Sequence, residues 1–68
     1  MVGEGAKGGP PGSSVFFEFT QIGVQMRVAA IDEKTGIEVV VIAPTTATQI
    51  QMQTLALAKL RRRLQQGA

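Results

Sequence analysis

Three largely apolar segments in the middle of the chain are typical of β-strands, and the second of them alternates between two faces at the two-residue period of a strand. They are VFFEFTQI at residues 15–22, VQMRVAAI at residues 24–31 and IEVVVIA at residues 37–43. All three are rich in β-branched or aromatic residues, which favour strands. Gly23 separates the first two segments, and DEKTG at residues 32–36 separates the last two. The pattern therefore predicts three consecutive antiparallel strands.

The first junction predicts a tight hairpin whose two loop residues are Ile22 and Gly23, with Gly23 supplying a positive φ. In that register Glu18 lies directly opposite Arg27, which predicts a cross-strand pair of opposite charge.

The second junction predicts a type I turn with a bulge, in which Asp32 bonds to nearby backbone and Gly36 takes the left-handed conformation. Asp32 then pairs with Ile37, and Pro44 ends the third strand because proline cannot donate to the ladder.

The two registers together place the larger apolar side chains on one face of the sheet, which we expect to face the core. They are Phe17, Phe19, Val24, Met26, Val28, Val39 and Val41.

A run without Gly or Pro follows at residues 48–66 and predicts a helix of about twenty residues. Thr46 and Gln49 fit a capping box at its start, and Gly67 fits its C-cap. At about 100° per residue, one side of the helix collects the residues that we expect to face the sheet. They are Ile50, Gln53, Ala56, Leu57, Leu60 and Leu64. The sequence thus predicts an α+β fold, a three-stranded antiparallel sheet (β-β-β-α) with one C-terminal helix packed on one face.

The first fourteen residues differ in composition from the rest, with five Gly, two Pro and two Ser and no hydrophobic run. This composition predicts a flexible, disordered tail at residues 1–14, followed by a single small domain at residues 15–68. The chain shows no signal-peptide pattern and no apolar stretch of transmembrane length. We therefore expect a cytoplasmic protein that does not enter a membrane.

The chain contains neither Cys nor His. Thiol nucleophiles, Cys/His zinc sites, the Ser-His-Asp triad and the usual general base at neutral pH are thereby excluded. Ser13 and Ser14 lack a base to activate them, and the carboxylates lack the cleft that a hydrolase needs. We expect no catalysis, no cofactor and no metal site.

The end of the predicted helix is basic, and no acidic residue follows Glu38. The cations of this candidate basic patch are Lys59, Arg61, Arg62 and Arg63. They fit either a surface for nucleic acid or an acidic protein, or simple compensation of the helix dipole. The second interpretation is the simpler one, because four charges give only weak, salt-sensitive binding. Three strands and a helix also occur in double-stranded-RNA-binding domains, but their lysine cluster is replaced here by the threonine-rich residues 45–48.

The segments VFFEF (15–19), VAAIDEKTGIEVVVIAP (28–44) and LALAKL (55–60) together resemble a small bacterial family of unknown function, found mainly in alphaproteobacteria. Ala43 stands where that family often has Gly, and Phe16 stands where it often has Tyr. The resemblance implies the three-strand-plus-helix pattern and implies no activity.

One helix covers only one face of such a sheet, yet the other face is also apolar, and the third strand lies at an open edge. The back of the helix carries large apolar groups as well. The candidate interface residues are Phe16, Ile31, Val40, Ile42, Met52 and Leu55. Exposed patches of this kind mark partners, and a small core gains stability from dimerisation. We therefore predict a small non-enzymatic binding protein that forms a homodimer, with weak nucleic-acid binding by the basic helix as the alternative.

Overall fold

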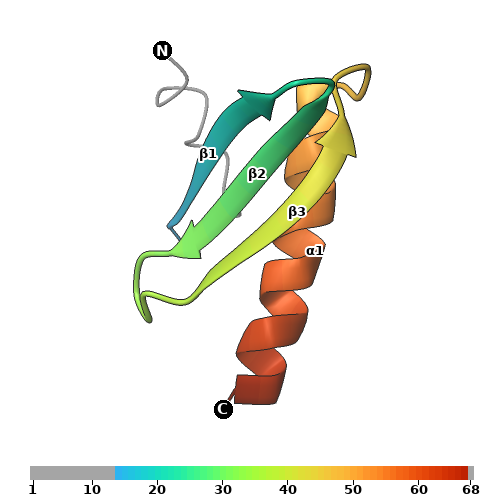
Figure 1. Cartoon of the computed structure of the whole chain (residues 1–68). Helices are drawn as coiled ribbons and strands as arrows, with labels where there is room; N and C mark the ends of the chain where they lie inside the picture. Colours follow the sequence, from blue (N-terminus) through green and yellow to red (C-terminus); the bar gives the residue numbers. More distant parts are fainter. Residues whose placement is uncertain (1–13, 68) are drawn as a thin grey trace.

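A computed structural model describes residues 14–67 of the chain. Strands β1 (Val15–Ile22), β2 (Gln25–Asp32) and β3 (Glu38–Pro44) form one antiparallel sheet in the order β1-β2-β3, and helix α1 (Gln49–Gly67) follows. The helix crosses one face of the sheet, over β2 and β3 (Figure 1). The predicted α+β fold is confirmed. The predicted disordered tail, except for Ser14, lies outside the described residues.

The first hairpin closes through Gly23 and Val24, because Ile22 pairs with Gln25. Gly23 has a φ of +62°, and Val24, the other residue of this loop, does not have a positive φ. A positive φ at the first of two loop residues is the type II′ pattern, which suits the twist of a hairpin. The predicted loop of Ile22 and Gly23 was therefore wrong. Val24 lies in the turn, 81% exposed, and not in the core as predicted.

This loop shifts the register of β1 and β2 by two residues from the predicted one. Glu18 lies opposite Ala29, and Arg27 lies opposite Thr20, so the predicted direct pairing of Glu18 with Arg27 is wrong. A shift of two residues keeps every side chain on its predicted face of the sheet.

The second hairpin has the predicted register, and Asp32 fixes it. The Asp32 amide donates to the Ile37 carbonyl at 2.8 Å, and the Gly36 amide donates to the Asp32 carbonyl at 2.7 Å. Oδ2 of Asp32 accepts from both the amide and the hydroxyl of Thr35, at 2.9 and 2.7 Å. Gly36 has the predicted positive φ, +77°.

The capping box of α1 is formed by Thr48 and Gln51. The Gln51 amide donates to Oγ1 of Thr48 at 3.1 Å, and the Thr48 amide donates to Oε1 of Gln51 at 2.9 Å. The predicted box of Thr46 and Gln49 was wrong because Thr46 lies inside a turn, which the bond from the Ala47 amide to the Pro44 carbonyl closes. Thr46 and Gln49 have the same three-residue spacing as Thr48 and Gln51, and the turn at Thr46 leaves Thr48 as the residue that caps the helix.

The core lies between α1 and the sheet. Its buried members are Val15, Phe17, Val28, Ala30, Val39, Ala43, Met52, Ala56 and Leu60. Met52 is only 6% exposed, although we predicted it on the solvent side, and Ile50 is 74% exposed, although we predicted it against the sheet. The buried row of the helix begins at Met52 and recurs every four residues. Ile50 lies about 160° around the helix from Met52 and so misses this row.

Candidate interaction site

The outer face of the sheet, opposite α1, carries an apolar band across all three strands. Phe16 and Ile42 are 45% and 54% exposed, and Ile31 and Val40 are half-buried. Ala29, at the middle of the band, is fully buried. Among residues 14–67, no helix or strand covers this face (Figure 1).

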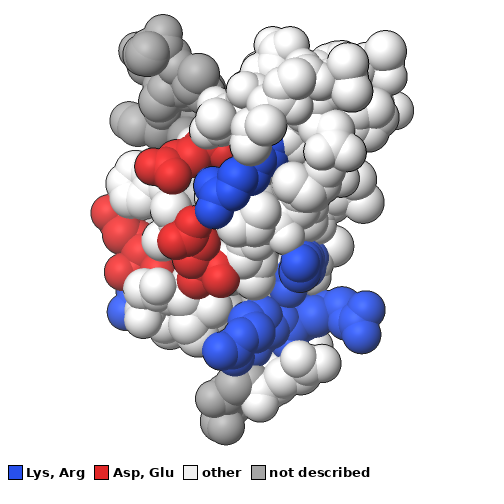
Figure 2. Space-filling model, in the orientation of Figure 1, with Lys and Arg blue, Asp and Glu red and all other residues white. Residues whose placement is uncertain are grey.

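The strand register gives this band a direction. It runs diagonally from Phe16 on β1, through Ile31, Ala29 and Val40, to Ile42 on β3. Charged side chains lie on both sides of it. Glu38 pairs with Ile31 on one side, while Glu18 and Arg27 lie on the other side. Figure 2 shows acidic groups gathered over the sheet and basic groups gathered where α1 ends.

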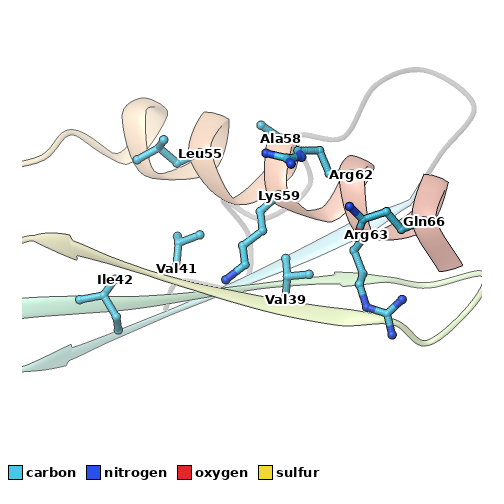
Figure 3. A pocket seen from close by; sticks show the side chains of 9 residues that line it. All are labelled: Val39, Val41, Ile42, Leu55, Ala58, Lys59, Arg62, Arg63 and Gln66. Atoms are coloured by element: carbon cyan, nitrogen blue, oxygen red, sulfur yellow. The ribbon is translucent and has the colours of Figure 1, made fainter.

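A groove of about 640 Å³ lies between β3 and α1 (Figure 3). It is lined by Val39, Val41, Ile42, Leu55, Ala58, Lys59, Arg62, Arg63 and Gln66. Leu55 lies at one end, and Arg62, Arg63 and Gln66 lie toward the other. None of these nine lining residues is acidic, so the groove is apolar at one end and cationic at the other.

Lys59 crosses this groove and closes part of the sheet edge. Its Nζ donates to the backbone carbonyl of Val40 at 2.7 Å (Figure 3). Successive residues of a strand direct their backbone amides and carbonyls alternately toward and away from a given neighbouring strand. The Ile37 carbonyl accepts from the Asp32 amide and so points toward β2, as do those of Val39 and Val41, whereas the Val40 carbonyl points away from β2. Lysines at sheet edges hinder pairing with further strands. We predicted an unprotected β3 edge, but Lys59 hinders the addition of another strand at the centre of this edge.

The predicted basic patch divides into three parts. Lys59 bonds to the β3 edge, and Arg62 and Arg63 line the groove. Arg61 is exposed but does not line the groove. The reason is the helix period, since consecutive residues differ by about 100° in direction.

A comparison with protein-family models matches residues 12–67 to DUF6898, a domain of unknown function. The chain belongs to this family. No curated protein and no solved structure matches it. The match agrees with the predicted resemblance to a family of unknown function.

Within residues 14–67 of this DUF6898 chain, no helix combines the length and the apolar character that crossing a bilayer requires. Nowhere in the same residues do three side chains of metal-ligating type gather at one place.

Sequence reasoning missed the contact between Lys59 and Val40, which lie 19 positions apart in the chain. The available signal was the lysine directly before Leu60, which is fully buried. A residue next to the centre of a buried row lies at the boundary of the helix–sheet interface. A long side chain there reaches the sheet edge with its cationic end.

Proposed function

We propose that this DUF6898 protein is a non-enzymatic binding protein that acts as a homodimer, joined through the outer face of its sheet. The observation that carries the proposal is the apolar band from Phe16 to Ile42. It crosses the whole sheet, and both of its end residues are about half exposed. Contiguous apolar surface of this kind marks interaction sites in small proteins.

The arrangement of the band supports a second copy as the partner. A twofold axis through Ala29, at right angles to the band, sets Phe16 against Ile42 of the second copy and Ile31 against its Val40. The same rotation sets Glu18 against Arg27 of the second copy. Two sheets stacked in this way cross near the orthogonal class of sheet packing. The face is therefore complementary to itself in apolar contact and in the pairing of Glu18 with Arg27, as a twofold interface requires, while the same rotation brings Glu38 close to Glu38 of the second copy.

Light scattering across about 0.1–1 mM protein tests the dimer. We expect a mass near 14.4 kDa, twice the chain mass of 7.2 kDa. Val40→Lys places a charge in the band and should return the mass to that of one chain. Val24→Lys makes the same chemical change at the 81% exposed hairpin turn and should leave the dimer intact. A mass of one chain for the natural sequence throughout this range would refute the proposal.

Weak nucleic-acid binding by Lys59, Arg61, Arg62 and Arg63 is the second candidate function. The exposure of the three arginines at the end of α1 favours it. The bond from Lys59 to Val40 weakens it, because that ammonium already has a partner. Titration with duplex RNA and DNA at about 50 mM salt tests it, and we expect no specific binding. We also propose a bacterial, cytoplasmic setting, and fractionation of the cells that produce the protein tests the compartment.

A further inference from the structure

We propose that the groove between β3 and α1 binds an extended acidic peptide segment, which adds to the edge of β3 as a fourth strand. This site differs from the proposed dimer surface. The groove opens on the helix side of the sheet, and Ile42 is the one described residue that belongs to both the groove and the band.

The backbone of β3 offers the hydrogen bonds that such a strand needs. Val39 and Val41 direct their amides and carbonyls toward β2, so Glu38, Val40 and Ile42 direct theirs outward. Within residues 14–67 no strand pairs with this outer side. Addition of a peptide strand to an open sheet edge is a common recognition mode, in which backbone bonds supply affinity and side-chain pockets supply specificity.

The groove determines which side chains the peptide carries. Alternate side chains of an added strand point toward α1. At one end they meet Val41 and Leu55, which favour an apolar residue. Farther along the groove they meet Arg63 and Arg62, the latter with its guanidinium turned back beside Ala58 (Figure 3), and such planar groups bind carboxylates in a bidentate manner. With no acidic residue in the lining, the site favours acidic side chains and repels basic ones.

Lys59 adds a second requirement for acidic residues. Its Nζ occupies the Val40 carbonyl, which is the acceptor that an incoming strand needs at the centre of the edge. Because Lys59 is exposed, a strand that displaces the ammonium returns it to water, and a carboxylate on that strand also gives it a charged partner. A strand without acidic side chains displaces the same bond and offers no charged partner in return. Lys59 therefore favours acidic strands over neutral ones.

The probe for this proposal is a blocked, fluorescently labelled eight-residue peptide that alternates Val and Glu. We expect saturable binding in fluorescence anisotropy at about 50 mM salt, and protection of the Val40 and Ile42 amides from hydrogen exchange. A peptide alternating Val and Lys should not bind. A Val/Glu peptide with a central Pro has nearly the same charge but cannot pair as a strand, and it should bind at least about tenfold more weakly.

The three arginines at the end of α1 provide a test variant, which removes two charges at the groove, and a control variant, which removes one charge outside it. The double variant Arg62→Gln, Arg63→Gln should weaken peptide binding about tenfold, whereas Arg61→Gln should leave it nearly unchanged. All three side chains are exposed, so folding should be retained, and circular dichroism checks it.

Several results would overturn the proposal. They are absence of saturable binding by the Val/Glu peptide, equal binding of the Pro-containing peptide, and an equal loss of affinity in Arg61→Gln. Binding of duplex RNA or DNA that all three arginines support equally, without peptide binding, would assign the basic residues to nucleic acid instead. Phe16→Lys disrupts the apolar band outside the groove and should still bind the peptide. Failure of the dimer and failure of the groove can thus be told apart.

Discussion

The two faces of the sheet are built from the same three strands but meet different surroundings. On the inner face, Val28 and Val39 are buried beneath α1. On the outer face, the neighbouring Val40 is half-buried and Ile42 is 54% exposed. Both faces are rich in β-branched residues, and one helix covers one of them.

The difference separates residues that fold the chain from residues that are free to bind. Inner-face side chains exchange water for protein within one copy, so their burial stabilises the monomer. Outer-face side chains gain the same stabilisation only when a partner covers them. We therefore expect substitutions on the inner face to change stability at any protein concentration. Substitutions on the outer face should change it only where a partner is bound.

The largest expected effect is that of Leu60→Ala on the inner face. Leu60 is fully buried at the centre of the helix–sheet contact, and its truncation leaves a cavity beneath the sheet. We expect a loss of about 2–5 kcal/mol, which approaches the whole stability of a domain of this size. Urea unfolding followed by circular dichroism measures it. A loss below about 1 kcal/mol would contradict the inner face as the source of stability.

Much of this division was predictable from the sequence. The two-residue period assigns each strand residue to a face, and an error of two residues in register preserves the assignment. Asp32 and Gly36 fixed the second register correctly, because their turn chemistry is specific. The first register was missed because Gly23 fits either position of a two-residue loop, and only the φ values identify the type II′ turn.

Two features could not be predicted from the sequence: which residues of α1 face the sheet, and the groove between α1 and β3. Apolar residues occur on several sides of α1, so the sequence did not identify the row that begins at Met52 rather than at Ile50. The capping pairs that begin at Thr46 and Thr48 have equal spacing, and the turn after Pro44 decides between them. The bond from Lys59 to β3 depends on the helix–sheet packing itself, which no local pattern encodes.

The second largest effect should follow from Asp32→Ala, which tests the turn that holds the two faces in register. Asp32 is 7% exposed, and its carboxylate accepts two hydrogen bonds from Thr35. Removing it leaves the Thr35 groups without that acceptor, so we expect a loss of about 1–3 kcal/mol. Glu33→Ala, at the exposed neighbouring position, is the control and should stay within about 0.5 kcal/mol. Equal losses in the two variants would contradict the role of Asp32.

A smaller effect is expected from Thr48→Ala, which tests how α1 begins before it covers the inner face. Its hydroxyl accepts from the Gln51 amide, and loss of such a cap costs about 1 kcal/mol. Thr46→Ala is a control with the same chemical change and should cost less than about 0.5 kcal/mol. Thermal unfolding of both variants decides the comparison. A larger loss of stability in Thr46→Ala than in Thr48→Ala would indicate that Thr46 is the N-cap, as predicted from the sequence.

The smallest effect on stability should come from Val40→Thr. The same substitution at the neighbouring Val39 compares the two faces of the sheet directly. Val39 and Val40 are adjacent in β3, but Val39 is 6% exposed on the inner face and Val40 lies on the outer face. The change to Thr keeps shape and β-branching while adding a hydroxyl. At Val39 the hydroxyl enters the core, and we expect a loss of about 1–3 kcal/mol at every protein concentration. At Val40 we expect less than about 0.5 kcal/mol at micromolar protein, where a weak dimer is dissociated.

At about 1 mM, dimerisation stabilises the natural chain, so the Val40→Thr loss should grow with concentration while the Val39→Thr loss stays constant. Urea unfolding at both concentrations measures the two trends. A Val40→Thr loss that is equally small at both concentrations would mean that a second copy does not cover the outer face.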